Sequence, residues 1–365
     1  MSDTTTQTLQ ISCPNCGSQE VVYDPVSRGL KCNHCGYQRE LPKEADQVVE
    51  HPLHMADNMD ELTHEFGVKE KVFHCENCGA DTIFPHDTVR IVCPFCDSEQ
   101  VNEMATETRL IKPTGVLPFT ITKEAGLTSY KQWLSKGWFA PNNLRKVAKI
   151  DRIHGMYLPF WTFDAFTRSH WTAQAGYYYY VSESYTDAEG NRRTRQVRKI
   201  RWKNASGYLE QFFDDVLVVA SHGVGQELMD RILPYELNET VNFDEQFLLG
   251  WDTELYQKDV KEGFRTADAK MDEALYAACA RQVPGDTHRF LRVDTDKEGL
   301  TFKHLLLPVW LASYQYKDKV YQFIVNGQTG AVAGRKPKSW WKIALAVLAG
   351  ILIVGGIVFF TQNGA

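Results

Sequence analysis

Cysteine spacing constrains this chain more than any other feature, because eight of its nine cysteines form four Cys-x-x-Cys pairs before residue 97. Nine cysteines in 365 residues are too few for a disulfide-stapled secreted scaffold, so the pairs indicate metal binding in a reducing compartment. Fifteen residues separate the first two pairs and fourteen the last two, which is room for a hairpin that brings four thiolates into the tetrahedron preferred by Zn²⁺. The sequence therefore predicts two structural zinc sites, one formed by Cys13, Cys16, Cys32 and Cys35 and one by Cys75, Cys78, Cys93 and Cys96.

A redox role is the competing interpretation, because CPNC and CPFC resemble the dithiols of thioredoxin-type proteins. Such proteins use a single pair in a βαβ setting, whereas here the pairs come in twos without that setting. Four thiolates also leave no open coordination position, which favours structure over catalysis. Cys279, the ninth cysteine, lies beside the apolar face of a predicted helix, and we expect it to be buried.

Recurring Leu-Pro phrases suggest a duplicated core at 111–335, with halves at about 111–220 and 231–335. Each half contains a helical stretch followed by a strand; Thr122 is expected to cap the first helix. The core follows zinc ribbons at 1–40 and 71–110, joined by an acidic linker at 41–70. The predicted class is α+β, mainly antiparallel. The phrases are VLPF at 116–119 and YLPFWTFDA at 157–165 in the first half, and ILPY at 232–235 and LLPVWLASY at 306–314 in the second.

A hairpin is predicted between the halves, with Gly190 and Asn191 at its turn. Period-two alternation places five basic residues of its second strand on one face, interrupted by Val197. This face could contact anionic lipid or an acidic partner, or it could be a charged edge strand that resists aggregation. The five residues are Arg193, Arg195, Lys199, Arg201 and Lys203.

The C-terminal segment 343–360 contains eighteen consecutive uncharged residues, roughly 27 Å of helix against a hydrocarbon core of about 30 Å. Trp340 and Trp341 resemble an interfacial aromatic belt, and positive charge lies only on the N-terminal side. We therefore expect a tail anchor at 336–365 that crosses the bacterial inner membrane once and leaves the preceding domains in the cytoplasm. Ala346 and Gly350 could support helix pairing and a homo-oligomer.

Charge and motifs limit the function classes. Residues 1–110 hold 8 Lys/Arg against 19 Asp/Glu, a net charge of −11, which is poor material for binding phosphate. The sequence lacks the GxxxxGK[ST], GxSxG, GxGxxG and HExxH motifs, so no catalytic residues are predicted and the protein is expected not to be an enzyme.

The paired Cys-x-x-Cys ribbons, LPFWTFDA and the VNGQTG-to-KSWWK phrase together resemble a family of bacterial membrane-bound zinc-ribbon proteins. Its members carry the labels TFIIB-type zinc ribbon protein or primosomal protein N' (replication factor Y) helicase-like. The helicase label is not supported by these residues, because the Walker motif is missing. The resemblance implies association with SPFH-domain or phage-shock-type membrane-stress partners.

These observations predict a scaffold that recruits protein partners to the membrane. Its ribbons are expected to present small, partly apolar surfaces around Pro14, Asn15, Pro94 and Phe95. The alternative is a membrane-tethered nucleic-acid-binding protein, and a third possibility is an enzyme with a groove between the core halves.

Overall fold

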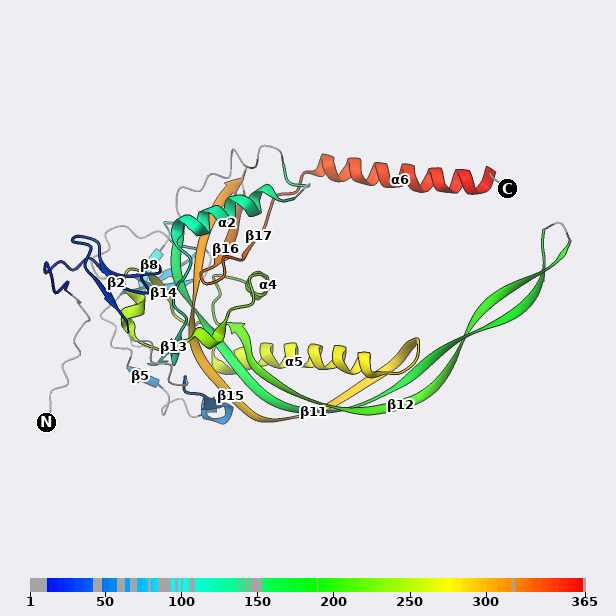
Figure 1. Ribbon diagram of the computed structural model, residues 1–365, viewed down its shortest axis with the longest axis horizontal. Coiled ribbons are helices and arrows are strands. Elements are labelled where there is room, and N and C mark those ends of the chain that lie inside the picture. The colour runs from blue at the N-terminus through cyan, green and yellow to red at the C-terminus, as the bar shows by residue number, and fades with distance from the viewer. Residues whose placement is uncertain are drawn as a thin grey trace.

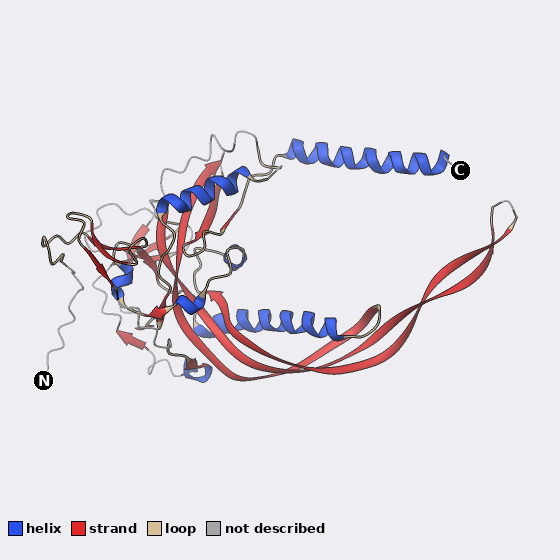
Figure 2. Ribbon diagram, in the orientation of Figure 1, coloured by secondary structure: helices blue, strands red, loops and turns tan. Residues whose placement is uncertain are grey.

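Three long antiparallel strands organise the molecule (Figures 1 and 2). β11 spans His154–Thr186, β12 spans Arg192–Val219 and β15 spans Thr287–Tyr316, with β11 in the centre. At about 3.3 Å per residue, the 33 residues of β11 extend over roughly 100 Å. The computed structural model describes residues 12–41, 48–57, 63–65, 71–77, 80–84, 93–95, 98–99, 101–104, 109–137, 139–141, 144, 153–188, 190–316 and 319–363.

The sheet changes width along these strands. β15 begins at Thr287, opposite Gly176, and pairs with β11 from there to His154, while β12 pairs with β11 as far as Phe160. We call this region, residues 154–176 of β11 with the strands paired to them, the base. Residues 177–203, which we call the arm, contain only β11 and β12, joined by a turn in which Gly190 has φ 85°. The arm projects away from the body of the molecule, as Figure 1 shows.

Two helices cover parts of this sheet. α5 (Val260–Gln282) begins at the Asp259 cap and buries Met271, Leu275 and Cys279. α2 (Lys123–Ser135) begins at Thr122, whose hydroxyl accepts a hydrogen bond from the Ala125 amide. The predicted cap and the predicted burial of Cys279 are therefore confirmed.

Short elements complete a 12-stranded sheet around the base. β10 pairs with β15 at Gly115↔Leu305, and β14 pairs with β11 at Met156↔Asp252, both parallel. The two helix-then-strand units therefore have equivalent pairings, although their common ancestry stays a prediction. ILPY at 232–235 does not form a strand. The short strand that precedes the helix of the second unit is β14, which corresponds to β10 before the helix of the first unit. The other members of this sheet are β4 (His51–Pro52), β6 (Lys71–Cys75), β7 (Asp81–Phe84), β8 (Val101–Met104), β10 (Gly115–Val116), β13 (Val241–Asn242), β14 (Asp252–Glu254), β16 (Lys319–Asn326) and β17 (Val332–Gly334).

The remaining elements are short. β1 to β3 form a separate three-stranded sheet, and β5 pairs with β9. Their bounds, with those of the short helices, are β1 (Val21–Asp24), β2 (Gly29–Cys32), β3 (Gln38–Glu40), η1 (Leu53–Asp57), β5 (Thr63–Glu65), β9 (Arg109–Ile111), α4 (Gln226–Asp230), η2 (Leu237–Glu239) and η3 (Glu245–Leu248).

The predicted α+β class is wrong, because strands dominate the described chain and most of them join one sheet. The physical reason lies in the aromatic and β-branched runs at 154–219 and 287–316. These runs continue as single strands well beyond the ordinary strand length of about 5–6 residues, instead of breaking into short elements between helices.

The predicted tail anchor is also wrong. Among the residues whose side chains the structure describes, no helix combines the length and the apolarity that a membrane crossing requires. The helix that this segment forms is α6, which spans Trp340–Asn363. The predicted inner-membrane location at 343–360 falls with the tail anchor.

Candidate metal centre, buried ion network and basic arm

Cys13, Cys16, Cys32 and Cys35 form a compact group that could bind a metal ion, with all four sulfurs within 4.8 Å of one another. The Sγ atoms of Cys13 and Cys35 are 3.6 Å apart, and those of Cys16 and Cys32 are 3.7 Å apart. These separations exceed the ~2.05 Å of a disulfide. They match a tetrahedron with Zn–S bonds of ~2.3 Å, whose sulfur–sulfur edges are about 3.8 Å. The donor set and its spacing therefore fit zinc.

Local backbone structure holds the four thiols in place. The Gly17 amide donates to the Cys13 carbonyl and the Gly36 amide donates to the Cys32 carbonyl, each at a knuckle where the glycine has a positive φ. β1 and β2 form the hairpin between the knuckles, as the spacing predicts. The side-chain amide of Asn15 donates to the Cys35 sulfur, and this hydrogen bond lowers the pKa of the Cys35 thiol to about 6. Cys16 is shifted the opposite way: the Ser18 backbone lowers its pKa, but burial and the three neighbouring thiols raise it, so a metal ion would displace a proton there on binding.

The unit that carries these four cysteines, residues 12–41, is docked on the core; we call it the head. Tyr23 is only 2% exposed, and its ring lies 5.4 Å from that of Phe247. Its amide donates to the Leu249 carbonyl, while the Trp251 indole donates to the Tyr23 carbonyl. The head is therefore joined to the core through a buried aromatic side chain and two backbone hydrogen bonds.

The second predicted metal site is described only in part. Cys75 and Cys93 are buried, whereas Cys78 and Cys96 lie outside the described residues. The amide of Cys75 donates to the Ala80 carbonyl and that of Cys93 to the Ser98 carbonyl. The same bond to the residue five positions later occurs at Cys13 and Cys32, with Ser18 and Tyr37 as acceptors.

Phe95 was predicted to be exposed and available to a partner, and this prediction is wrong. Both Pro94 and Phe95 are buried, and the Phe95 ring packs against Gly223, where a Cβ would lie 2.6 Å from it. The Phe95 carbonyl accepts a hydrogen bond from the Gln322 side chain. Phe95 therefore anchors the second ribbon to the core and is not available to a partner.

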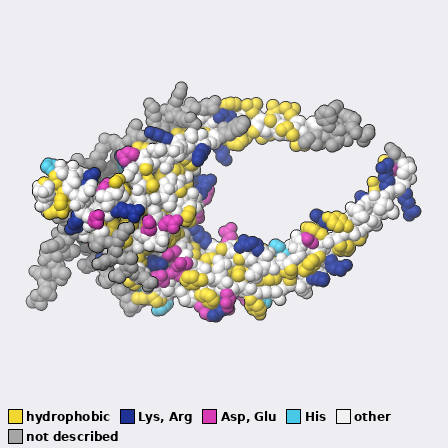
Figure 3. All heavy atoms as spheres, in the orientation of Figure 1, with side chains coloured by type: hydrophobic (Ala, Val, Ile, Leu, Met, Phe, Trp, Pro, Cys, Tyr) yellow, Lys and Arg dark blue, Asp and Glu magenta, His cyan; other side chains and the backbone are white. Residues whose placement is uncertain are grey.

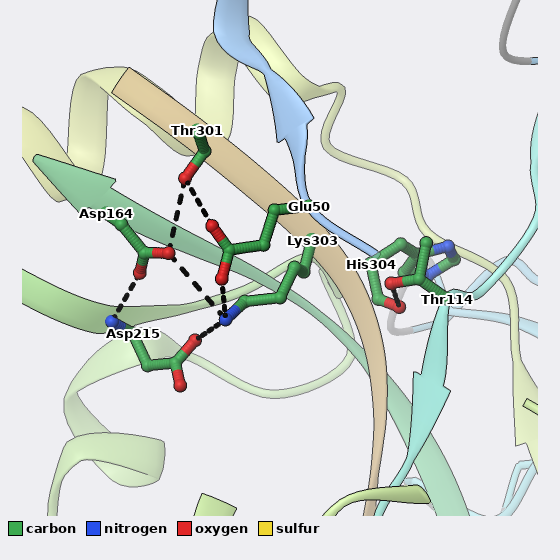
Figure 4. A network of polar contacts seen from close by, with 7 residues as sticks. All are labelled: Glu50, Thr114, Asp164, Asp215, Thr301, Lys303 and His304. Carbon is green, nitrogen blue, oxygen red and sulfur yellow. Dashed lines mark hydrogen bonds and ion pairs between the residues drawn. The ribbon is translucent and has the colours of Figure 1, made fainter. Parts of the chain in front are cut away.

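A buried ion network lies at the base (Figure 4). The Lys303 ammonium is 2.7 Å from Asp215 Oδ1, 3.1 Å from Glu50 Oε1 and 3.7 Å from Asp164 Oδ2. Asp164 stands at a bulge of β11, where it accepts a hydrogen bond from the Asp215 amide. Burial raises the pKa of Asp164 to about 6, against the opposing effects of that hydrogen bond and of Lys303.

Asp164, Asp214 and Asp215 place carboxylate oxygens within 4.8 Å of one another, a separation that could also suit a cation. Lys303 already supplies a positive charge there. Burial lowers the pKa of Lys303, but the carboxylates outweigh burial and the net shift is upward. We therefore assign this network to structure. Sequence reasoning missed it because its members are far apart in the chain and match no local motif.

The arm carries the basic residues that the sequence singled out. The register of β11 and β12 puts Arg193, Arg195, Lys199, Arg201 and Lys203 on one face, as period-two alternation predicts. Figure 3 shows Lys and Arg side chains gathered along the arm and carboxylates gathered over the body.

Comparison with known proteins identifies one relative. The chain is 30% identical to the "Uncharacterized protein YdjG" of Bacillus subtilis (strain 168) over 344 residues, which is 92% of each chain. No protein-family model matches the sequence, and no solved structure matches it. With this identity over nearly the whole length, the chain belongs to the YdjG family.

Proposed function

We propose that the chain is a non-enzymatic adaptor, in which a zinc-stabilised head and a basic arm bind protein partners at opposite ends of the molecule. The observation that carries this proposal is the arm. Its two strands, β11 and β12, extend well past the ends of β15 and α5, the described elements that pack on them in the base. Such an extension adds nothing to the buried core, whereas it exposes side chains that a partner can contact. Tyrosine and arginine, which dominate the arm, are enriched at the energetic centres of protein interfaces.

The metal belongs to this proposal as a structural ion. Zinc at Cys13, Cys16, Cys32 and Cys35 would hold the head together. A second zinc would be bound by Cys75, Cys78, Cys93 and Cys96. The repeated amide-to-carbonyl bond at Cys75 and Cys93 supports this second site, because the same bond forms at both knuckles of the first.

Nucleic-acid binding is the second candidate function, and the arm is the observation that favours it. Basic side chains interleaved with aromatic rings suit single-stranded nucleic acid, since bases stack on the rings and phosphates pair with the cations. The net charge of −11 over residues 1–110 argues against the same role for the ribbons.

An arm-shortened variant tests both functions. Tyr179 and Lys199 are paired across the ribbon and face each other, whereas the Tyr178 amide points to Asp286. A two-residue turn needs a facing, hydrogen-bonded pair on either side, so 180–198 can be replaced by Asn-Gly without changing the register on the core side. Affinity purification with the wild-type and shortened proteins should give a partner that requires the arm; SPFH and phage-shock-type proteins are the first to probe. Retention of single- or double-stranded DNA that falls steeply with salt would instead support the second function. If neither partner nor DNA depends on 180–198, the adaptor proposal is wrong.

A further inference from the structure

β12 has one paired edge and one open edge. It pairs with β11 in a single register from Arg192 to Phe213, and no other described strand pairs with it. The Tyr178 amide of β11 donates to Asp286, on the side away from β12, so the facing pair Tyr178↔Ile200 is not hydrogen-bonded. Because such pairs alternate along an antiparallel ribbon, the amide and carbonyl of every second residue of β12, Ile200 among them, point outward from the open edge.

Side chains close this edge where β12 enters the body of the molecule. The Gln226 side chain accepts a hydrogen bond from the Val219 amide, and the Lys270 ammonium donates to the Leu217 carbonyl. Among the described residues, no side chain or strand bonds the outward backbone groups from 192 to 212 in this way. The edge is therefore satisfied near the core and open along the arm.

Charge decides which strand could pair with the open edge. Sheets usually protect such edges with short strands, prolines, bulges, charges or a covering element. β12 is 28 residues long, contains no proline and has no bulge from Arg192 to Phe213. Residues 192–203, however, hold seven Lys/Arg and no Asp/Glu. The same segment of a second copy would place like charges opposite one another, which is destabilising, whereas a strand of opposite charge would be stabilised.

Much of this positive charge is not neutralised within the ribbon. Asp187 and Glu183 form ion pairs with part of it. Arg198, Arg201 and Lys203 have no carboxylate partner among the described residues, and each contacts a tyrosine ring of β11 instead, at 4.4, 5.5 and 5.5 Å. These contacts keep the charge and hold the side chains beside the open edge, so less order has to be gained when a partner binds.

We propose that the open edge of β12 at 192–203 binds an extended acidic segment of a partner protein as an added β-strand. Hydrogen bonds to the outward amides and carbonyls supply the affinity, and carboxylates opposite the cations select the partner. This inference rests on the proposed adaptor function, which it deepens by naming the chemistry of the arm's partner and its mode of binding. Nucleic acid would use the cations and the rings but not the backbone groups of the edge.

The test uses the full chain, in a nonionic detergent that covers the exposed apolar side chains of α6, and a synthetic peptide that alternates Glu and Thr over the length of 192–203. Fluorescence anisotropy of the labelled peptide measures its dissociation constant. The same peptide with every amide N-methylated keeps its charge but cannot pair as a strand, and we expect it to bind at least roughly tenfold more weakly. A Lys-Thr peptide should not bind, because like charges then face one another.

A proline variant makes the same separation on the side of the protein. Gln196 lies four positions before Ile200, so its amide also points outward, and Gln196→Pro removes that donor without removing a hydrogen bond to β11. We expect this variant to bind the Glu-Thr peptide roughly tenfold more weakly, whereas the matched control Gln196→Thr, which keeps the amide, should bind it as the wild type does. Arg198→Gln/Arg201→Gln/Lys203→Gln should weaken binding and reduce its dependence on salt.

The outcomes separate the occupants of the edge. Equal binding of the methylated and unmethylated peptides, which needs no variant to fold, would overturn the proposal in favour of charge attraction alone. No binding of the Glu-Thr peptide at low salt would also overturn it and leave the charges as protection of an edge strand. A dimer that Gln196→Pro abolishes would assign the edge to a second copy, and DNA retention in place of peptide binding would assign it to nucleic acid. If the peptide fails while affinity purification still finds an arm-dependent partner, the adaptor function survives without this inference.

Discussion

The base and the arm are built from the same two strands, yet the same residue types behave differently in them. At the base, Tyr157 and Trp161 are fully buried; in the arm, Tyr179 and Tyr180 are 39% and 64% exposed. The two regions differ in which other elements pack on the strands. The third strand begins opposite Gly176, and α5 ends at Gln282. The last contacts with the ribbon that the structure records from this side are those of Gly285 with the Tyr177 ring, Asp286 with the Tyr178 amide and Arg289 with the Trp202 ring. The tyrosine rings further along, at 179 and 180, are therefore exposed to a partner.

The boundary between the two regions is fixed by particular contacts. The Trp171 indole donates to the Gln282 side chain at the end of α5, and the Asp286 amide donates to the Gly176 carbonyl. These bonds close the covered region at the place where the third strand starts. Whether the aromatic side chains of a strand are buried or exposed therefore depends on what packs on that strand and not on its own composition.

We expect the largest structural effect from metal removal, which tests whether the head depends on its metal in the way that the base depends on its buried core. Four thiolates are assembled only by folding, so a chelator or Cys32→Ser should unfold the head and remove one metal equivalent per chain. Because the Trp251 indole donates to the Tyr23 carbonyl, tryptophan fluorescence should shift to the red as well. Ser27→Ala, in the same head but away from the sulfurs, serves as the control. Full metal content after Cys32→Ser would contradict the assignment of this site.

A core truncation should come next. Trp161→Ala removes a fully buried ring that packs against Gly263 and donates to the Lys258 carbonyl. We expect a loss of about 3–5 kcal/mol in the free energy of unfolding, from lost burial and from the cavity left behind. Tyr179→Ala, on the same strand in the arm, should cost less than about 0.5 kcal/mol. Urea titration measures both, and similar costs at the two positions would break the comparison between base and arm.

A smaller effect, dependent on pH, is expected at the ion network. The pKa of Asp164 is about 6 in the folded protein, above its ordinary value of about 3.9, so the folded state binds more protons between these values. The stability contributed by Asp164 is therefore present below pH ~4 and is lost as the pH rises through ~6, by on the order of 1–3 kcal/mol.

The measurement is the difference in unfolding free energy between the wild type and Asp164→Asn from pH 4 to 7.5. The difference is needed because buried His304, whose pKa is lowered to about 4 by burial, produces the opposite slope in the same range. The wild type should lose stability relative to Asp164→Asn as the pH rises. A flat difference between the wild type and Asp164→Asn would refute the assignment.

Local patterns predicted local structure well. The spacing of Cys13, Cys16, Cys32 and Cys35 predicted their compact cluster in the head, and period-two alternation predicted the basic face of the arm. The sequence could not show at which residue the packing of β15 and α5 on the long strands ends, because that depends on which distant segment lies against each strand. Phe95 was expected to be exposed since it follows a knuckle proline, yet it packs on Gly223, 128 positions away. The ion network escaped notice for the same reason, as Glu50 and Lys303 meet only through the pairing of β4 with β15.

The smallest effect on stability should come from the largest change in sequence. Replacing 180–198 by Asn-Gly removes most of the arm but keeps the pairing of β15 with β11, which ends at Gly176, and the bond from the Tyr178 amide to Asp286. The ion pairs and ring contacts that are lost lie at the surface, where such pairs contribute little. We therefore expect the free energy of unfolding to change by less than about 1 kcal/mol, compared with about 3–5 kcal/mol for Trp161→Ala. Urea titration of the shortened chain, with metal content measured alongside to confirm an intact head, checks this. A loss of more than about 2 kcal/mol would mean that the arm supports the core, and its exposed tyrosines and cations would then need no partner to explain them.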